Sequence, residues 1–261
     1  MYKRLVGARL RAQVSYRTSF AVNTIGSFVL TCVDLIEVLV LFLHFDALGT
    51  WTLPQIALLY GISGIGLAAA DMVIGHIEQI DVAIRSGQFD VVLLRPAGTL
   101  LQVAASDFAL RKIGRVAQAA IALAYAFWAG VIVVTPLSMF LLVLGVFAAA
   151  LVFASIFIFG SCINFWTIGS SEAANAFSYG GNYLSAYPLD IFGVWLRRFL
   201  AFIVPLGFVI YFPGLYLLDK PDPFGLPRGV EFIALPVALA FFALTCFVWR
   251  VAVRHYRSTG S

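Results

Sequence analysis

The chain of 261 residues is 62% hydrophobic and only 11% charged, with a formal net charge of +4. A typical soluble domain is close to half apolar and about a quarter charged, so this composition excludes an ordinary water-soluble globular protein. The basic residues lie in short segments beside apolar runs, where they can pair with anionic lipid head groups. The charge therefore indicates a membrane protein and no nucleic-acid-binding module.

The first 19 residues form a basic amphipathic segment. Its apolar positions are Leu5, Leu10 and Val14, and its polar positions are Arg4, Arg11 and Arg17. Such a segment can lie in the membrane interface, and it can equally be a simple topology anchor. The apolar run that follows is longer than the roughly 7 to 15 residues of a signal-peptide core, so we expect it to remain as a spanning helix.

Six apolar runs are close to the length of about 20 residues that a helix needs to cross the hydrocarbon core. They occupy residues 20–43, 54–75, 116–134, 137–158, 199–218 and 232–251. Spanning strands would be about ten residues long and would alternate in polarity, whereas a helix satisfies its backbone groups within one segment. The sequence thus predicts one all-α membrane domain over residues 1–261 with six transmembrane helices.

The basic residues are unevenly distributed between the two sides of the predicted bundle. Five precede the first span, five lie between the second and third, two lie between the fourth and fifth, and three follow the last. The remaining connections hold only Lys220 and Arg228. By the positive-inside rule, we expect a multi-pass protein of the cell membrane with both termini in the cytoplasm.

Asp34 and Glu37 lie three residues apart inside the first predicted span, and therefore on one helical face. A carboxylate at membrane depth costs about 3 kcal/mol on insertion scales, so both side chains must face protein or a water-filled cavity. A polar cavity lining and a structural pair or hydrogen-bonded carboxyl remain open as interpretations. Proton coupling is the weakest interpretation, because no other predicted span holds a basic partner.

Two further patterns predict side-chain packing within the bundle and not a nucleotide-binding or metal site. The stretch GISGIGLAAA at 61–70 formally matches a dinucleotide-binding fingerprint, but it lies inside a span with no strand before it. We expect it to be a small-residue face for close helix packing. Cys32, Cys162 and Cys246 lie in separate apolar runs without metal-ligand spacing, so we expect small buried hydrophobic side chains.

The connection over residues 76–115 is the longest between predicted spans and contains an amphipathic helix. Its apolar face consists of Ile77, Ile80 and Ile84, and its polar face of Glu78, Asp81 and Arg85, before Gly87 ends it. A short helix of this kind can lie on the membrane surface or stand out as a ridge for a partner's groove. The amphipathicity alone does not decide between these two interpretations.

Two sequence blocks carry a family resemblance. The stretch IRSGQFDVVLLRP at 84–96 resembles the cytoplasmic signature of permease subunits of ABC transporters of the type-2 export class. Residues 187–218 are similar to that family's pattern of Tyr-Pro, a Leu-Arg pair, a proline inside the fifth span and a Tyr-x-Pro near its end. The matching positions are Tyr187, Pro188, Leu196, Arg197, Pro205, Tyr211 and Pro213. We expect the last two prolines to kink the fifth span. The loop at 219–229 is short, and the sequence does not show whether the re-entrant exterior helices of many relatives are present.

The resemblance implies a permease that is not itself an enzyme and binds no cofactor or metal, while ATP and Mg²⁺ bind to a partner, a cytoplasmic ABC ATPase. It implies a second permease in the bilayer, identical or a sister subunit, and export of an amphipathic or hydrophobic drug, lipid or natural product. The coupling segment, 76–115, would contact the ATPase through Glu78, Asp81, Ile84, Arg85 and Phe89. The candidates for the substrate pathway are Asp34, Glu37, Pro205, Tyr211 and Pro213.

Two other classes of function compete with this interpretation. An intramembrane enzyme would need a nucleophile with a base, or a metal cluster, and the sequence has no Gly-x-Ser-x-Gly motif and no histidine in the middle of a predicted span. A secondary transporter or channel that works without an ATPase is the alternative. Such proteins usually contain internal repeats with matched broken helices, and we detect no repeat here.

Overall fold

The computed structural model describes residues 17–167, 179–227 and 229–256. The predicted amphipathic segment at the N-terminus lies outside the described residues, except for the start of the first helix. The described residues are helical and contain no β-strand beyond an isolated bridge between Leu48 and Trp51. The predicted all-α fold is therefore confirmed for the part of the chain that the structure describes.

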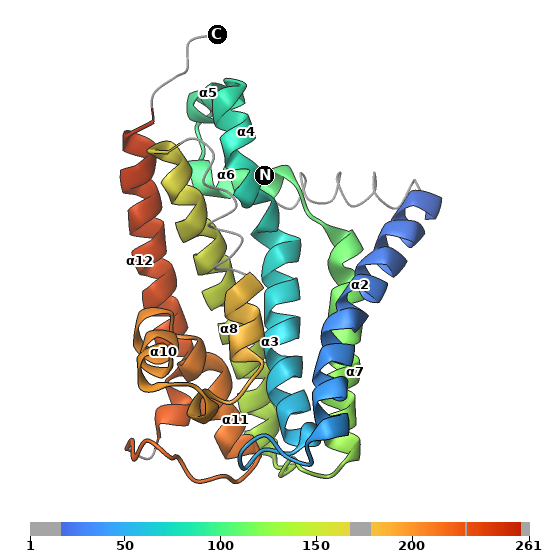
Figure 1. Ribbon diagram of the computed structural model, residues 1–261. Helices are drawn as coiled ribbons and strands as arrows, with labels where there is room; N and C mark the ends of the chain where they lie inside the picture. The colour runs from blue at the N-terminus through green and yellow to red at the C-terminus, as the bar shows by residue number, and fades with distance from the viewer. Residues whose placement is uncertain (1–16, 168–178, 228, 257–261) are drawn as a thin grey trace.

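Five long helices form the bundle in Figure 1: α2 (Arg17–His44), α3 (Leu53–Ile74), α7 (Ile113–Trp128), α8 (Pro136–Cys162) and α12 (Ala234–Arg254). At one end, which we call the α4 end, lie the 3₁₀ helix η1 (Gly75–Gln79), α4 (Ile80–Arg85), α5 (Gln88–Leu94) and α6 (Thr99–Ser106). The opposite end, which we call the Trp51 end, contains the loop after α2. The first residues of α2 and the last residues of α12 lie at the α4 end.

Four of the described helices are long and apolar enough to cross a membrane, or five if one bent pair counts as a single span. The four are α2, α3, α8 and α12 with their helical extensions. The predicted span at 116–134 coincides with α7, which is antiparallel to α3 but has only 16 residues. The protein is thus a multi-span membrane protein, whereas the count of six spans stays a prediction.

Helix α3 is the centre of the bundle, with α7 and α8 packed against it. A Cβ atom on Gly64 would lie 2.8 Å from the Cβ of Ala119 in α7, and one on Gly66 would lie 2.7 Å from the Cβ of Ala149 in α8. Only glycine allows backbones to approach this closely. The predicted role of residues 61–70 in helix packing is therefore confirmed.

Burial differs strongly between the helices. In the most apolar part of each helix, 78% of the residues are buried for α3 and 61% for α8, but only 11% for α2 and 22% for α12. Helices α2 and α12 therefore lie at the periphery and expose most of their side chains. Those exposed surfaces must face either lipid or another protein.

The predicted fifth span at 199–218 is broken at Pro205, one of the two prolines expected to kink it. Helix α10 (Val194–Arg198) continues as the π-helix η5 (Phe199–Ile203), and a second π-helix, η6 (Gly207–Tyr211), continues as α11 (Phe212–Leu217). The two halves are bent by 81°. The break contains Pro205, which lacks an N–H and cannot continue the helical hydrogen bonds. Pro213 lies in the first turn of α11, where a proline is tolerated and causes no break.

The bent pair enters and leaves at the same end of the bundle. Before it, Asp190 accepts hydrogen bonds from the Trp51 indole Nε1 at 3.1 and 3.0 Å. After it, Lys220 Nζ donates to the backbone oxygen of Thr50 at 2.8 Å. Since both ends are bound to the same loop, the pair is a re-entrant hairpin. The re-entrant element, whose presence the sequence left open, lies within residues 190–220 and not in the loop at 219–229.

The segment before the hairpin runs along the bundle toward the Trp51 end. Its helical residues begin with Tyr179, whose ring lies 5.4 Å from the guanidinium of Arg115 near the start of α7. Asn182 then accepts a hydrogen bond from Ser63 in the middle of α3. The chain finally reaches Asp190 beside Trp51. The sequence analysis had treated this segment as a connection on one side of the membrane.

Because the chain runs this way, Arg197 and Arg198 lie at the Trp51 end. The number of basic residues on the predicted cytoplasmic side is therefore smaller by two than the sequence indicated. Arg197 is used structurally, because its Nη2 donates to the backbone oxygens of Asp190 and Phe192 at 3.3 and 3.1 Å. Its guanidinium also lies 5.0 Å from the ring centre of Phe224. The contacts of Arg197 therefore stabilise the base of the hairpin.

Candidate functional site

A polar cavity of about 150 Å³ lies between α2, α3, α7 and the helical residues that begin at Tyr179. Its wall consists of Thr31, Asp34, Tyr60, Gly64, Leu67, Arg115, Gln118, Tyr179, Asn182 and Tyr183. Ionisable and hydrogen-bonding side chains at membrane depth are expensive and usually functional. Their concentration around one cavity, in a chain that is 62% hydrophobic, makes this cavity the candidate site.

Asp34 reaches the cavity from α2. The hydroxyl of Tyr183 donates to Asp34 Oδ1 at 2.7 Å. Among the described residues, the ion pairs within 4.0 Å do not include Asp34. The side chain of Tyr183 is itself 44% exposed, so this corner of the cavity is only partly covered by the protomer.

Buried hydrogen bonds hold the opposite wall. Gln118 Nε2 donates to the Tyr60 hydroxyl at 3.0 Å, and joins α7 to α3. The Ser63 hydroxyl donates to Asn182 Oδ1 at 2.9 Å and shares a hydrogen bond with the Ser185 hydroxyl at 2.7 Å. Because these polar groups satisfy one another, the wall keeps a defined shape in an apolar surrounding.

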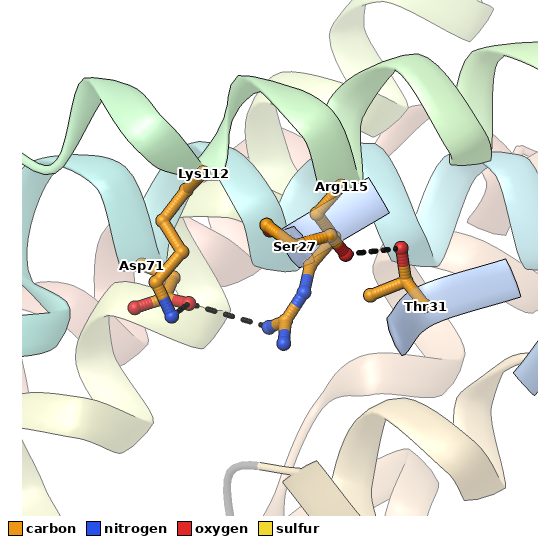
Figure 2. A network of polar contacts seen from close by, with 5 residues as sticks. All are labelled: Ser27, Thr31, Asp71, Lys112 and Arg115. Carbon is orange, nitrogen blue, oxygen red and sulfur yellow. Dashed lines mark hydrogen bonds and ion pairs between the residues drawn. The ribbon is translucent and has the colours of Figure 1, made fainter. Parts of the chain in front are cut away.

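A charged network lies beside the cavity near the α4 end. The carboxylate of Asp71, close to the end of α3, is only 6% exposed and binds Lys112 Nζ at 2.8 Å and Arg115 Nη1 at 3.2 Å. Figure 2 shows Asp71 facing these two cations, with Ser27 and Thr31 of α2 on the other side of Arg115. Arg115 therefore belongs both to this network and to the cavity wall.

The network was not predicted from the sequence. Asp71 lies near the end of the second predicted span and was expected only to reach the cytoplasmic interface, and Lys112 and Arg115 were counted only among the five basic residues that follow that span. A signal was nevertheless present, because a carboxylate at the end of one span and cations at the start of the next meet when the two helices are antiparallel neighbours. The same applies to Gln118, a polar residue inside an apolar run.

The structure separates the predicted substrate-pathway residues. Asp34 lines the cavity, whereas Glu37, one turn further along α2, is exposed and is not part of the cavity wall. Pro205, Tyr211 and Pro213 are buried in the re-entrant hairpin near the Trp51 end and do not line the cavity. The Tyr211 hydroxyl instead donates to Asp190 Oδ1 at 3.2 Å.

The predicted contact residues of the α4 end divide into a buried and an exposed group. Ile84 is 4% exposed and Phe89 is fully buried, with its ring 5.3 Å from that of Phe165 and 5.0 Å from that of Tyr256. Phe89 was expected to contact a partner as an apolar anchor. Because it is buried, it instead packs α5 against the rest of the bundle. The aromatic contacts come from distant parts of the chain, so the sequence pattern did not reveal them.

The exposed group is different. Glu78 does not belong to it, because it is buried at 9% exposed, whereas Arg85 is exposed and forms an ion pair of 3.2 Å with Asp81. Large apolar side chains beside them are exposed, among them Val82 at 59%, Val91 at 50% and Leu94 at 85%. A partner that binds this end of the bundle would therefore contact Val82, Arg85, Val91 and Leu94.

Comparison with known proteins gives one match. A family model described as "ABC-2 family transporter protein" matches residues 28–260. No curated protein and no solved structure matches the chain. The matched region includes α2 from residue 28 onward, the short helices of the α4 end, the re-entrant hairpin and α12.

Proposed function

The chain belongs to the ABC-2 family of transporter proteins, and on this premise we propose that it is the permease subunit of an ATP-driven exporter. Members of this family are the membrane components of ABC transporters and work with a partner ATPase. We propose export of an amphipathic or hydrophobic compound, with ATP and Mg²⁺ bound by the ATPase subunit and no cofactor bound by this chain.

The observation that carries the proposal is the polar cavity beside a charged network. The network connects the last turn of α3, which leads directly into η1 and α4, with the cavity wall at Arg115. A displacement of α4 relative to α7 would change the position of Arg115. A partner drives such a displacement only if its contacts differ between its two states, as they do when an ATPase closes on nucleotide.

The α4 end offers a suitable contact surface for the ATPase. Its outer surface carries Val82, Val91 and Leu94, together with Arg85. Its base is held rigidly, since Ile84 and Phe89 are buried. In addition, the Ser161 hydroxyl of α8 donates to the backbone oxygen of Ile77 at 3.0 Å. A rigid base can transmit the motion of a partner to the helices behind it.

We propose that a second permease, identical or a sister subunit, covers the outer face of α2. This face exposes Ile36 and Leu43 by 53% and 80%, and Glu37 is exposed beside it. A carboxylate that faced lipid there would cost about 3 kcal/mol. Helix α12 exposes apolar side chains too, but its charged residues lie only in its last turns, so it suits a lipid environment.

The distribution of basic residues supports cytoplasmic termini and a cytoplasmic α4 end. Only four of the 17 Lys and Arg residues, namely Arg197, Arg198, Lys220 and Arg228, belong to the hairpin and to the segment between it and α12. The others lie in the N-terminal segment, in residues 85–115 and at the end of α12. The positive-inside rule places the richer side in the cytoplasm of the cell.

Transport by reconstituted vesicles tests the proposal. Vesicles that contain the permease and its ABC ATPase partner are expected to move a fluorescent amphiphile only when ATP and Mg²⁺ are present. Leu94→Asp is expected to abolish this transport and the association with the ATPase, and Trp195→Phe, far from the α4 end, serves as the matched control. Uptake by the permease alone would overturn the proposal in favour of a secondary transporter or channel.

A further inference from the structure

The two charged residues of the cavity wall have different partners, and this difference indicates the kind of compound that the cavity binds. Asp34 and Arg115 are these two residues. Arg115 is paired with Asp71 at 3.2 Å. The described partner of Asp34 is the neutral hydroxyl of Tyr183. Among the described residues, Asp34 is thus the charged residue of the wall that has no oppositely charged side chain within 4.0 Å.

The second cation of the network does not compensate Asp34. Lys112 binds Asp71 at 2.8 Å, on the side toward the α4 end, and is not part of the cavity wall. A carboxylate at membrane depth without a cationic partner is strongly unfavourable. A cation that enters the cavity from outside would give Asp34 such a partner.

We propose that the cavity binds the positively charged, ammonium-type head group of the transported amphiphile, with Asp34 as its counterion. This inference rests on the proposed function and names the chemical class of its substrate. Three tyrosines in the wall, Tyr60, Tyr179 and Tyr183, add to the attraction. The face of an aromatic ring attracts a cation by about 0.5 to 2 kcal/mol. The Arg115 guanidinium already lies over the Tyr179 ring at 5.4 Å, which leaves Tyr60 and Tyr183 for a bound head group.

The size of the cavity limits the ligand to a small head group. A volume of about 150 Å³ holds a group about as large as benzene, which is enough for a trimethylammonium group but not for its alkyl chain. The chain can lie on α2, where Leu30, one helical turn from Asp34, is 72% exposed and Val33 is 51% exposed. An amphiphile with a cationic head and an apolar tail fits this arrangement of charge and surface.

Binding to the isolated permease in lipid nanodiscs tests the inference without the ATPase and without transport. Decyltrimethylammonium and decyl phosphate, both below their micelle concentrations, are titrated by calorimetry. The trimethylammonium probe is expected to bind to the wild-type protein at least about tenfold more tightly than the phosphate probe, because a charged contact contributes about 1.5 to 3 kcal/mol. Equal or tighter binding of decyl phosphate would overturn the inference, and this comparison needs no variant.

Substitutions assign the binding to Asp34. Asp34→Asn is expected to weaken binding of the trimethylammonium probe about 10- to 100-fold, and Asp34→Glu, which keeps the charge, is expected to retain most of it. Asp46→Asn removes an exposed carboxylate just after α2 and serves as the matched control. Unchanged binding in a folded Asp34→Asn variant would overturn the assignment. If the wild-type permease does not bind the trimethylammonium probe but still transports with ATP and its ATPase, that result would contradict this inference alone and leave the proposed function standing.

Discussion

The indole of Trp51 and the carboxylate of Asp190 are 139 residues apart in the sequence, and the Nε1 of Trp51 donates to both carboxylate oxygens. Trp51 is 1% exposed, and its ring lies 4.0 Å from Lys220 Nζ. The Tyr211 hydroxyl binds the same carboxylate. This cluster joins the loop after α2 to both arms of the re-entrant hairpin.

Trp51→Phe should therefore loosen the hairpin. The substitution keeps the apolar ring but removes the N–H donor, and we expect a loss of about 1 to 3 kcal/mol in the free energy of unfolding. Hydrogen exchange of residues 190–220 should become faster, and thermal unfolding in detergent should start at a lower temperature. Trp195→Phe is the control, because Trp195 is 76% exposed. Equal effects of both variants would show that Asp190 does not hold the hairpin through Trp51.

Asp71→Asn should destabilise the bundle more than Lys112→Ala does. The first change leaves two cations without their carboxylate, and removal of the shared partner of a buried pair costs about 3 kcal/mol or more. The second leaves the Asp71–Arg115 pair in place and removes a side chain that is 23% exposed, so a loss of about 1 kcal/mol is expected. Thermal melting of the two purified variants measures the difference. The opposite order would contradict the central role of Asp71.

Gly114→Ala should displace α2. A Cβ at this position would lie 2.3 Å from the Thr24 backbone oxygen and 2.9 Å from the Phe28 nitrogen, and overpacking of this kind costs about 1 to 3 kcal/mol. Gly26→Ala is the matched control in α2, since nothing lies within 4 Å of its Cβ position. It should be neutral or slightly stabilising. A melting temperature that is equal for both variants would contradict the close contact between α2 and α7.

Phe89→Ala and Leu94→Asp should affect different properties. Phe89 is fully buried, so its truncation is expected to cost about 3 to 5 kcal/mol of stability. Leu94 is 85% exposed, so Leu94→Asp should leave the melting temperature nearly unchanged and reduce co-purification of the ATPase. Size-exclusion chromatography of the complex, together with thermal melting, separates the two effects. A stable Phe89→Ala variant that has lost only ATPase binding would instead return Phe89 to the contact surface.

Single cysteines should cross-link across α2 and not across α12. In a background without Cys32, Cys162 and Cys246, Ile36→Cys is expected to give an oxidised dimer in native membranes. A disulfide requires Cα atoms within about 7 Å, so it reports direct apposition of the two helices. Leu244→Cys in α12, with a similar exposure of 54% against 53%, is the control. Cross-linking through Leu244→Cys alone would place the second permease on α12.

The sequence predicted the fold class and the long apolar helices because both depend on local composition. The sequence did not show whether residues 199–218 cross the membrane as one helix or enter and leave on the same side, because both arrangements bury an apolar segment of similar length. The proline at 205 indicated a kink, but the direction of the second arm depends on Trp51 and Thr50, which belong to a distant loop.

The candidate site was predictable only in part. Asp34 stands out from the sequence because a carboxylate in an apolar run demands a partner. Tyr183 and Gln118 could not be assigned to the same cavity, since that requires knowledge of which helices are neighbours. The burial of Ile84 followed the amphipathic pattern, whereas the burial of Phe89 depends on aromatic rings that approach from the ends of α8 and α12.

Arg115 is shared by two neighbours, the carboxylate of Asp71 and the interior of the cavity. A guanidinium that moves toward one of them moves away from the other. Thermodynamic linkage then requires that an occupant of the cavity and a bound partner at the α4 end alter each other's affinity by the same factor. In the proposed exporter, this side chain would couple the binding of cargo in the cavity to the nucleotide state of the ATPase.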